Sequence, residues 1–143
     1  MPARLQVPQV IDRPQATVFH FYADDHVLNH PRWDPDMKLE QVSAGPIGVG
    51  TVIRRHHTHS GIPVEGTMEV VEFERDRAFG VVIHDGPAEM LGRVTFEAIS
   101  PDKTTLTISV EFPGMDESTD MSRLTGLVKR SAWNIKQLIE SET

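Results

Sequence analysis

The chain has 143 residues, a hydrophobic fraction of 38% and a formal net charge of −7. This length predicts a single domain spanning residues 1–143, large enough to bury roughly two-thirds of the surface that the unfolded chain exposes. The negative charge argues against a general nucleic-acid-binding protein, because phosphate contacts need clustered Lys and Arg side chains. The sequence contains no cysteine, which excludes disulfides, thiolate metal sites and cysteine nucleophiles.

The N-terminal segment predicts a strand and two short helices. Residues 5–11 are rich in Val and Ile and favour a first strand, and the segment has no apolar run long enough for a signal peptide or a membrane span. We therefore expect a cytoplasmic protein without stable membrane insertion. Pro14 suits the first position of a helix, and residues 16–23 carry the apolar spacing of a short one. Residues 26–30 are expected to form one more helical turn, which ends before Pro31 because a proline interrupts helical hydrogen bonding.

From residue 37 onward the apolar spacing changes to the period of strands. The clearest strand is 104–112, where apolar residues alternate with Thr, Ser and Glu, so that one face is expected to be buried and the other wet. Short turns, including one at Ser60-Gly61, favour hairpins and an antiparallel sheet. The predicted strands after the short helices are 38–43, 51–59, 64–74, 78–84, 90–99 and 104–112.

Residues 118–142 predict one long amphipathic helix with Ser118 as its N-cap. Acidic residues crowd its start, where the helix dipole favours negative charge. Its apolar stripe must be buried against something, and one curved sheet packed around one helix is the simplest arrangement that covers both apolar faces. The stripe consists of Met121, Leu124, Val128, Ile135, Leu138 and Ile139.

Several motifs resemble the SRPBCC superfamily, which includes START domains, birch-pollen-allergen-like proteins and polyketide cyclase/dehydrase-like proteins. The later hairpin and the terminal helix also resemble those of the family, so the likeness covers essentially the whole chain. The motifs are Ile11-Asp12-Arg13-Pro14, Val18-Phe19, Ala23-Asp24, Pro31-Arg32-Trp33-Asp34-Pro35 and Gly45-Pro46-Ile47-Gly48-Val49-Gly50-Thr51.

The resemblance implies an α+β helix-grip fold. In this fold a seven-stranded antiparallel sheet curves around the C-terminal helix, two short helices lie between the first and second strands, and an elongated cavity remains between sheet and helix. The family binds lipids, polyketides and other apolar molecules, some members catalyse cyclisation or dehydration, and neither use requires a cofactor. No catalytic residue is common to the superfamily, so none is transferred to this chain by motif.

The first functional hypothesis is a carrier or sensor that binds an apolar or aromatic small molecule in this cavity. Trp33 offers an aromatic wall for a flat ligand, or it anchors the short helices on the sheet. The terminal helix is expected to contribute cavity residues as well as core residues. The predicted ligand-binding residues are Trp33, His59, Met68, Val81, Ile83, Phe96, Leu124 and Val128.

The alternative hypothesis is an enzyme of the polyketide cyclase/dehydrase kind. His57 is suited to proton transfer near neutral pH, Arg55 to holding an enolate or carboxylate, and Tyr22 to donating a proton or hydrogen bond. The two faces of strand 51–59 are about equally apolar, so the sequence leaves open which of them looks inward. One face carries Ile53, Arg55, His57 and His59, and the other carries Val52, Arg54, His56 and Thr58.

Two histidine pairs have spacings that could place two imidazoles on one metal ion, but solvated polar positions are the commoner origin of such pairs. We therefore predict no metal site and no cofactor. Trp133 falls almost opposite the apolar stripe of the terminal helix. An exposed Trp there would suggest a homodimer or a protein-interaction surface, whereas packing along a neighbouring strand edge would not. The histidine pairs are His57 with His59 and His26 with His30.

Overall fold

The computed structural model describes residues 1–59 and 61–143. Its strands are β1 (Pro2–Ile11), β2 (Lys38–Gln41), β3 (Val52–His59), β4 (Ile62–Glu74), β5 (Ala78–Asp85), β6 (Ala88–Ser100) and β7 (Lys103–Asp116). Its helices are α1 (Gln15–Phe19), α2 (His26–Trp33) and α3 (Ser122–Glu142), with a π-helical turn η1 (His20–Asp24). The turn predicted at Ser60-Gly61 includes Ser60, which lies outside the described residues.

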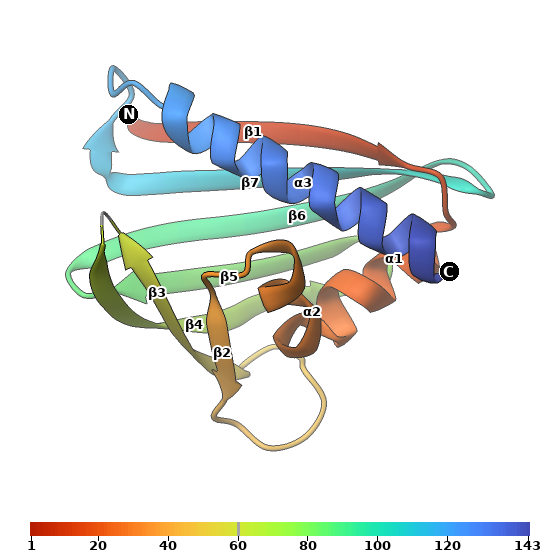
Figure 1. Ribbon diagram of the computed structural model, residues 1–143, viewed down its shortest axis with the longest axis horizontal. Helices are drawn as coiled ribbons and strands as arrows, with labels where there is room; N and C mark the ends of the chain where they lie inside the picture. The colour runs from red at the N-terminus through yellow and green to blue at the C-terminus, as the bar shows by residue number, and fades with distance from the viewer. Residues whose placement is uncertain (60) are drawn as a thin grey trace.

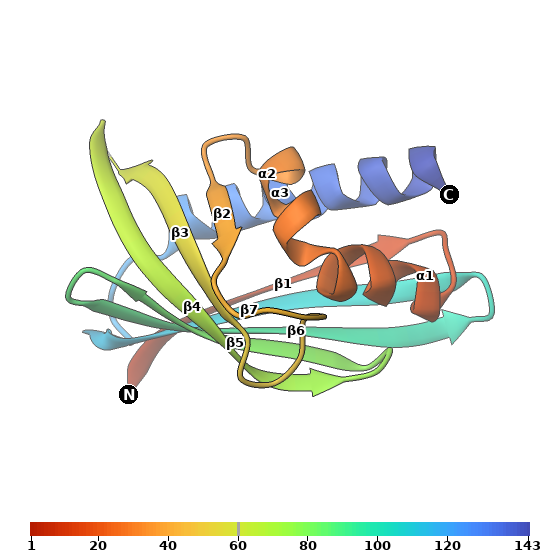
Figure 2. The same cartoon turned by 90° about the horizontal axis from the view of Figure 1, so that it is seen from below.

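All seven strands form one antiparallel sheet in the order β1-β7-β6-β5-β4-β3-β2. The first and last strands are therefore neighbours, and β1 and β2, which follow one another in the sequence, lie at opposite edges (Figure 1). Figure 2 shows α1, α2 and α3 on the same side of the sheet, with β2, β3 and β4 curling towards them. The predicted α+β helix-grip fold is confirmed.

Side-chain alternation along the strands builds the core on the concave face. In β3, Ile53 and Arg55 are buried, while Arg54 between them is exposed. The structure thus decides which face of this strand looks inward: the one that carries Ile53, Arg55, His57 and His59. His84, on the opposite parity of β5, is exposed as its spacing indicates.

The long helix begins at Ser122, four residues later than predicted, and Ser118 as its N-cap is wrong. Strand β7 continues to Asp116, so the chain needs residues 117–121 to turn from the strand into the helix. Within that turn the Ser118 hydroxyl donates to the Asp116 carboxylate, and Asp120 Oδ1 accepts the amide hydrogen of Ser122 at 2.9 Å.

The short helices also differ from the prediction in detail. The segment expected as one helix over 16–23 is α1 followed by the π-helical turn, in which the Asp25 amide donates to the His20 carbonyl at 3.1 Å. The expected stop before Pro31 is wrong, because α2 continues to Trp33. Pro31 lies in the last turn, so it removes only one hydrogen bond, and burial of Trp33 at 4% exposure outweighs that loss.

Helix α3 is buried unevenly along its length. Its C-terminal half contributes the buried residues Ala132, Ile135 and Ile139, whereas residues 122–131, all of them described, include no buried side chain. The C-terminal end is also tied down, since Glu142 pairs with Arg32 of α2 and Glu140 accepts the Asp12 amide hydrogen at 2.9 Å. None of the helices in the described part of the chain combines the length and hydropathy needed to cross a membrane.

Alanine substitutions at two glycines are expected to change the free energy of unfolding in opposite directions. Gly126 lies inside α3 with no atom within 4 Å of where a Cβ would sit, so Gly126→Ala should stabilise the protein by about 0.5–1 kcal/mol through helix propensity. Gly50 has φ +94°, so Gly50→Ala should destabilise it by about 1–2 kcal/mol. Urea unfolding measures both changes, and a destabilising Gly126→Ala would contradict the helical assignment.

Candidate functional site

A buried ion pair lies on the concave face where β3 and β5 approach each other. Arg55 Nε is 3.0 Å from Asp85 Oδ1, and both side chains are more than nine-tenths buried. The other carboxylate oxygen, Oδ2, lies 2.9 Å from His57 Nε2. One carboxylate therefore holds an arginine and a histidine that the sequence analysis singled out, and it fixes both side chains inside the curve of the sheet.

Gly66 explains how residues on two non-adjacent strands can meet. It lies on β4 between them, opposite Arg55 on one side and opposite Asp85 on the other. A Cβ built at this position would lie 2.1 Å from Asp85 Oδ1 and 2.4 Å from the His84 carbonyl oxygen. Any other residue at position 66 would therefore occupy the space that the Asp85 carboxylate uses to reach Arg55.

The ion pair is close but its hydrogen bonding is incomplete. Although Arg55 Nε and Asp85 Oδ1 are within 3.0 Å, the N–H does not point at the oxygen. Neither atom has a hydrogen-bond partner among the described residues. The contact is therefore a close ion pair with poor hydrogen-bond geometry between two atoms that are almost fully withdrawn from solvent. Burial lowers the pKa of Arg55, although Asp85 and Asp34 act in the opposite direction.

A chain of two histidines from α2 lies close to this pair. His26 Nδ1 is 2.9 Å from the Tyr22 carbonyl oxygen, and His26 Nε2 is 3.0 Å from His30 Nδ1. Burial lowers the pKa of His26 to about 4 and that of His30 well below its usual value, so both rings are neutral at pH 7. Nearby positive charge from Arg55 lowers both pKa values further.

The neutral state fixes the hydrogen positions along this chain. A carbonyl oxygen can only accept, so His26 Nδ1 carries the hydrogen and His26 Nε2 is an acceptor. His30 Nδ1 must then donate to it, which leaves His30 Nε2 with a lone pair. That nitrogen is 3.9 Å from Asp34 Oδ2. The chain of histidines thus presents a hydrogen-bond acceptor at its outer end.

Trp33 joins this cluster to the apolar core. Its ring stacks with Tyr22 at 5.1 Å and 14° and with His30 at 5.2 Å and 16° between ring planes. Its carbonyl oxygen accepts a hydrogen bond from Asn134 Nδ2 of α3 at 3.2 Å. These contacts anchor α2 between the sheet and α3, while a role of Trp33 as a ligand wall stays a prediction. Burial raises the pKa of Tyr22 above its usual value, so its phenol keeps its proton.

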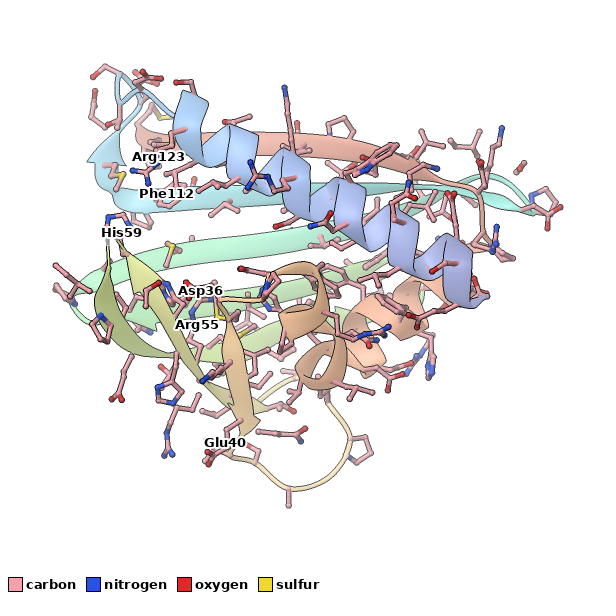
Figure 3. The ribbon with its side chains drawn as sticks, viewed as in Figure 1. Asp36, Glu40, Arg55, His59, Phe112 and Arg123 are labelled. Carbon is pink, nitrogen blue, oxygen red and sulfur yellow. The ribbon has the colours of Figure 1, made fainter. Side chains whose placement is uncertain are left out.

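Carboxylates surround the outer edge of the cluster. Burial, followed by the charge of Asp36, raises the pKa of Asp34, which lies near Arg55 and His57. Asp36 accepts hydrogen bonds from the backbone and hydroxyl of Thr58. Figure 3 shows Arg55 inside the curve of the sheet and Glu40 at the far end of β2.

The predicted apolar ligand contacts fall into three groups. Met68, Val81 and Phe96 are buried on the concave face. Ile83, Leu124 and Val128 are half-buried and pack against the core, while His59 is exposed at the end of β3. Sheet residues of the same inward parity that also keep some exposure are Met90 and Val110.

Two surface hollows lie away from this cluster. One of about 510 Å³ is lined by Val71, Leu91 and charged residues of the outer sheet face, and one of about 330 Å³ lies next to Gln15 at the start of α1. Both are open to the surface and are lined by a mixture of charged and apolar residues, and neither is lined by Arg55, His57 or Asp85.

The predicted histidine pairs behave differently. His26 and His30 bond to each other, and His57 bonds to Asp85 while His59 is exposed. Within residues 1–59 and 61–143, no group of three His, Asp or Glu side chains is placed to hold a metal ion.

Comparisons with known proteins decide the family. The family model described as polyketide cyclase / dehydrase and lipid transport matches residues 2–140. The chain belongs to this family. The resemblance to the SRPBCC superfamily, inferred from motifs, is thereby confirmed. A comparison with curated proteins yields no match.

Solved structures share the fold at low sequence identity. The crystal structure of Ara h 8.0201 has a TM-score of 0.79 and 16% identity, covering 99% of this chain and 100% of that one. Norcoclaurine synthase from Thalictrum flavum has a TM-score of 0.76 and 16% identity, covering 100% of this chain and 89% of that one. Major latex-like protein 151 from Panax ginseng has a TM-score of 0.76 and 14% identity, covering 96% and 97%.

Asp85 and Gly66 are not among the residues predicted from the sequence, and His30 was considered there only as half of a possible metal-binding pair with His26. The predicted strand 78–84 stops before Asp85, and this end is wrong by one residue because β5 continues to Asp85. The alternation of Val81, Ile83 and Asp85 was the available signal, since it places the carboxylate on the buried face.

Gly66→Ala tests the geometry of the ion pair. The added methyl group should destabilise the protein by roughly 2 kcal/mol, because it overlaps the Asp85 carboxylate and adjacent backbone. Gly114→Ala on β7, where a Cβ has no atom within 4 Å, is the matched control and should change stability by less than about 0.5 kcal/mol. Equal changes in the free energy of unfolding for Gly66→Ala and Gly114→Ala, measured with urea, would contradict the crowding at Gly66.

The buried histidines predict a loss of stability on acidification. Since the folded state lowers the pKa of His26 from 6.5 to about 4, the unfolded chain binds the proton more readily, and stability falls as the pH drops from 6.5 towards 4. This contributes about 1 kcal/mol per pH unit between pH 6 and 5. His26→Gln should flatten the measured slope by that amount, whereas His59→Gln at an exposed position should not. If the unfolding free energies of His26→Gln and of the wild type changed equally with pH, folding would not lower the pKa of His26 and the prediction would be wrong.

Proposed function

We propose that this protein binds an apolar or aromatic small molecule between the concave face of the sheet and the N-terminal half of α3, as a carrier or sensor in the cytoplasm. The observation that carries the proposal is the uneven burial of α3. Leu124 and Val128 lie on the stripe that packs towards the core, yet both remain half-buried. Apolar side chains that face a sheet without being buried by it are suited to covering a ligand.

The inward residues of the sheet support the same location. Ile83 and Met90 are paired across β5 and β6 and are only partly buried, as is Val110 on β7. In both ribbon views the start of α3 lies at the same end of the molecule as the end of β3 and the start of β4 (Figures 1 and 2). Family membership adds weight, since its description includes lipid transport. The structure of norcoclaurine synthase that shares this fold is a complex with dopamine and hydroxybenzaldehyde.

An enzyme of the polyketide cyclase/dehydrase kind is the second candidate. The observation that favours it is the placement of Arg55 and His57, which both face inward and share the Asp85 carboxylate. Such a pair suits holding an enolate while a proton is transferred. Tyr22, whose pKa is raised by burial, would act as a hydrogen-bond donor. Retained turnover of a polyketide substrate in His57→Ala combined with Arg55→Ala would rule out this role for them.

A protein-interaction surface is the third and weakest candidate. Trp133 is 53% exposed and Leu127, six residues earlier on α3, is 47% exposed. Light scattering of wild type and Trp133→Ala tests a homodimer, and identical monomer masses would refute it.

Charge on the inner side of α3 tests the main proposal. Val128→Glu should weaken binding of a fluorescent fatty acid by about tenfold or more, because a carboxylate would enter the apolar binding space. Leu127→Glu, on the exposed side of the same turn, is the matched control and should leave the affinity unchanged. Displacement titration gives both values, and native mass spectrometry shows any ligand carried from expression. The proposal fails if the wild-type protein takes up no apolar probe.

A further inference from the structure

We propose that the outer face of α3 docks the protein reversibly on an anionic lipid surface. This face combines two exposed apolar side chains with three exposed cations. The inference goes beyond the proposed ligand binding and does not depend on it. The residues of the outer face are Arg123, Leu127, Lys129, Arg130 and Trp133.

Helical spacing gathers these side chains opposite the side of α3 that packs on the core. They recur every three or four residues, and Lys129 lies beside Arg130 at the border of the face. Trp133 is 53% exposed and Leu127 is 47% exposed. In Figure 1 α3 runs in front of the sheet, and none of the other drawn helices or strands passes over it. The outer face is therefore accessible along its length.

The cations of the outer face have no carboxylate partner. Among residues 1–59 and 61–143, no carboxylate oxygen lies within 4.0 Å of the charged nitrogens of Arg123, Lys129 or Arg130. Exposed arginines elsewhere are paired, as Arg75 is with Asp24. The positive charge of the outer face is thus available to an anionic partner.

The sequence keeps acidic residues away from the middle of α3. Residues 121–139 contain no Asp or Glu, although the whole chain has 21 acidic and 14 basic residues. The nearest acidic residues in the sequence lie beyond this range, within 116–120 and 140–142. The outer face is therefore a positive region on a negatively charged protein.

Charge favours a lipid surface over a second copy of the chain as the occupant. In a two-fold pairing of this face, Leu127 would meet Trp133 across the axis, and Arg130, midway between them, would lie opposite its own copy. Like charges brought together in this way repel each other. An anionic lipid surface instead gives each cation a counter-ion, and it offers the indole ring of Trp133 the headgroup region that tryptophan prefers.

Such a face supports reversible, salt-dependent attachment. Each Lys or Arg near an anionic membrane surface strengthens binding about fivefold, so three cations give roughly a hundredfold. The attraction falls off within about 8 Å at physiological ionic strength. Acidic residues on the far side of the sheet therefore contribute little repulsion, and the local charge of α3 outweighs the net charge of the chain.

Sedimentation with lipid vesicles tests the inference. The wild-type protein should bind vesicles of phosphatidylcholine with about one-third phosphatidylserine at least about tenfold more tightly than vesicles of phosphatidylcholine alone. Trp133 fluorescence should then shift to shorter wavelength, whereas Trp33, at 4% exposure, should not contribute. Equal binding to both vesicles, or binding to neither, would overturn the inference. A dimer detected by light scattering without vesicle binding would instead assign the face to a second copy.

Lys129→Gln combined with Arg130→Gln should weaken binding to the anionic vesicles by about tenfold or more. The matched control is Arg4→Gln combined with Lys38→Gln, which removes two exposed cations on β1 and β2 and changes the net charge equally. The control should keep the wild-type affinity, because neither residue lies on α3. An equal loss in both double variants would show that net charge alone governs binding and would overturn the inference.

Trp133→Ala tests the apolar part of the face. It should weaken vesicle binding several-fold and abolish the fluorescence shift, since the indole no longer enters the headgroup region. A shift that persists in this variant would come from Trp33 and would refute the placement of Trp133 in the lipid surface. Sedimentation counts only protein attached to vesicles, so the proposed ligand binding, measured with the fluorescent fatty acid, stands or fails separately.

Discussion

The arrangement of this protein depends on the pairing of its first strand with its last. Because β1 pairs with β7, it lies at one edge of the sheet while β2 lies at the other. The segment between them, residues 12–37, must therefore cross the concave side. This crossing segment forms helices α1 and α2. His26, His30 and Trp33 therefore lie on the inner face because the chain must run from one edge of the sheet to the other.

The same constraint divides the concave face into two parts. Where α1 and η1 cross, aromatic side chains fill the space: Phe19 packs edge-on against Phe73 and Phe96 at 5.3 and 5.1 Å. Where α2 packs beside β2, the contents become polar, with the Arg55–Asp85 pair and the two histidines of α2. The terminal helix covers the rest, firmly at its C-terminal half and loosely at its N-terminal half. Apolar packing, buried polar groups and the loosely covered part of the sheet are thus separated along one surface.

Much of the fold could be predicted from local patterns. Alternation in residues 104–112 and the apolar stripe of α3 each depend on residues close in sequence, and both gave the correct element type. Helix boundaries were less predictable: tertiary packing of Trp33 carried α2 through Pro31, and the length of β7 delayed the start of α3. These are effects of distant contacts on local preferences.

The polar cluster was harder to predict for a similar reason. The inward face of β3 could not be chosen from its own residues, since both faces are about equally apolar. The choice depends on Gly66 and Asp85, which neighbour Arg55 only after three strands have paired. His57 and Arg55 were identified as candidates by residue type alone, and the carboxylate that joins them lies one residue beyond the predicted strand 78–84.

The bond from His26 to the Tyr22 carbonyl has a consequence for how the site responds to its surroundings. A main-chain carbonyl cannot ionise, rotate to donate or be altered by substitution of its own side chain. Since the direction of the whole histidine chain is set at this oxygen, the acceptor at His30 is specified by the backbone. The outer nitrogen of His30, Nε2, therefore stays a hydrogen-bond acceptor across the neutral pH range. It becomes a donor only when acid protonates the buried rings.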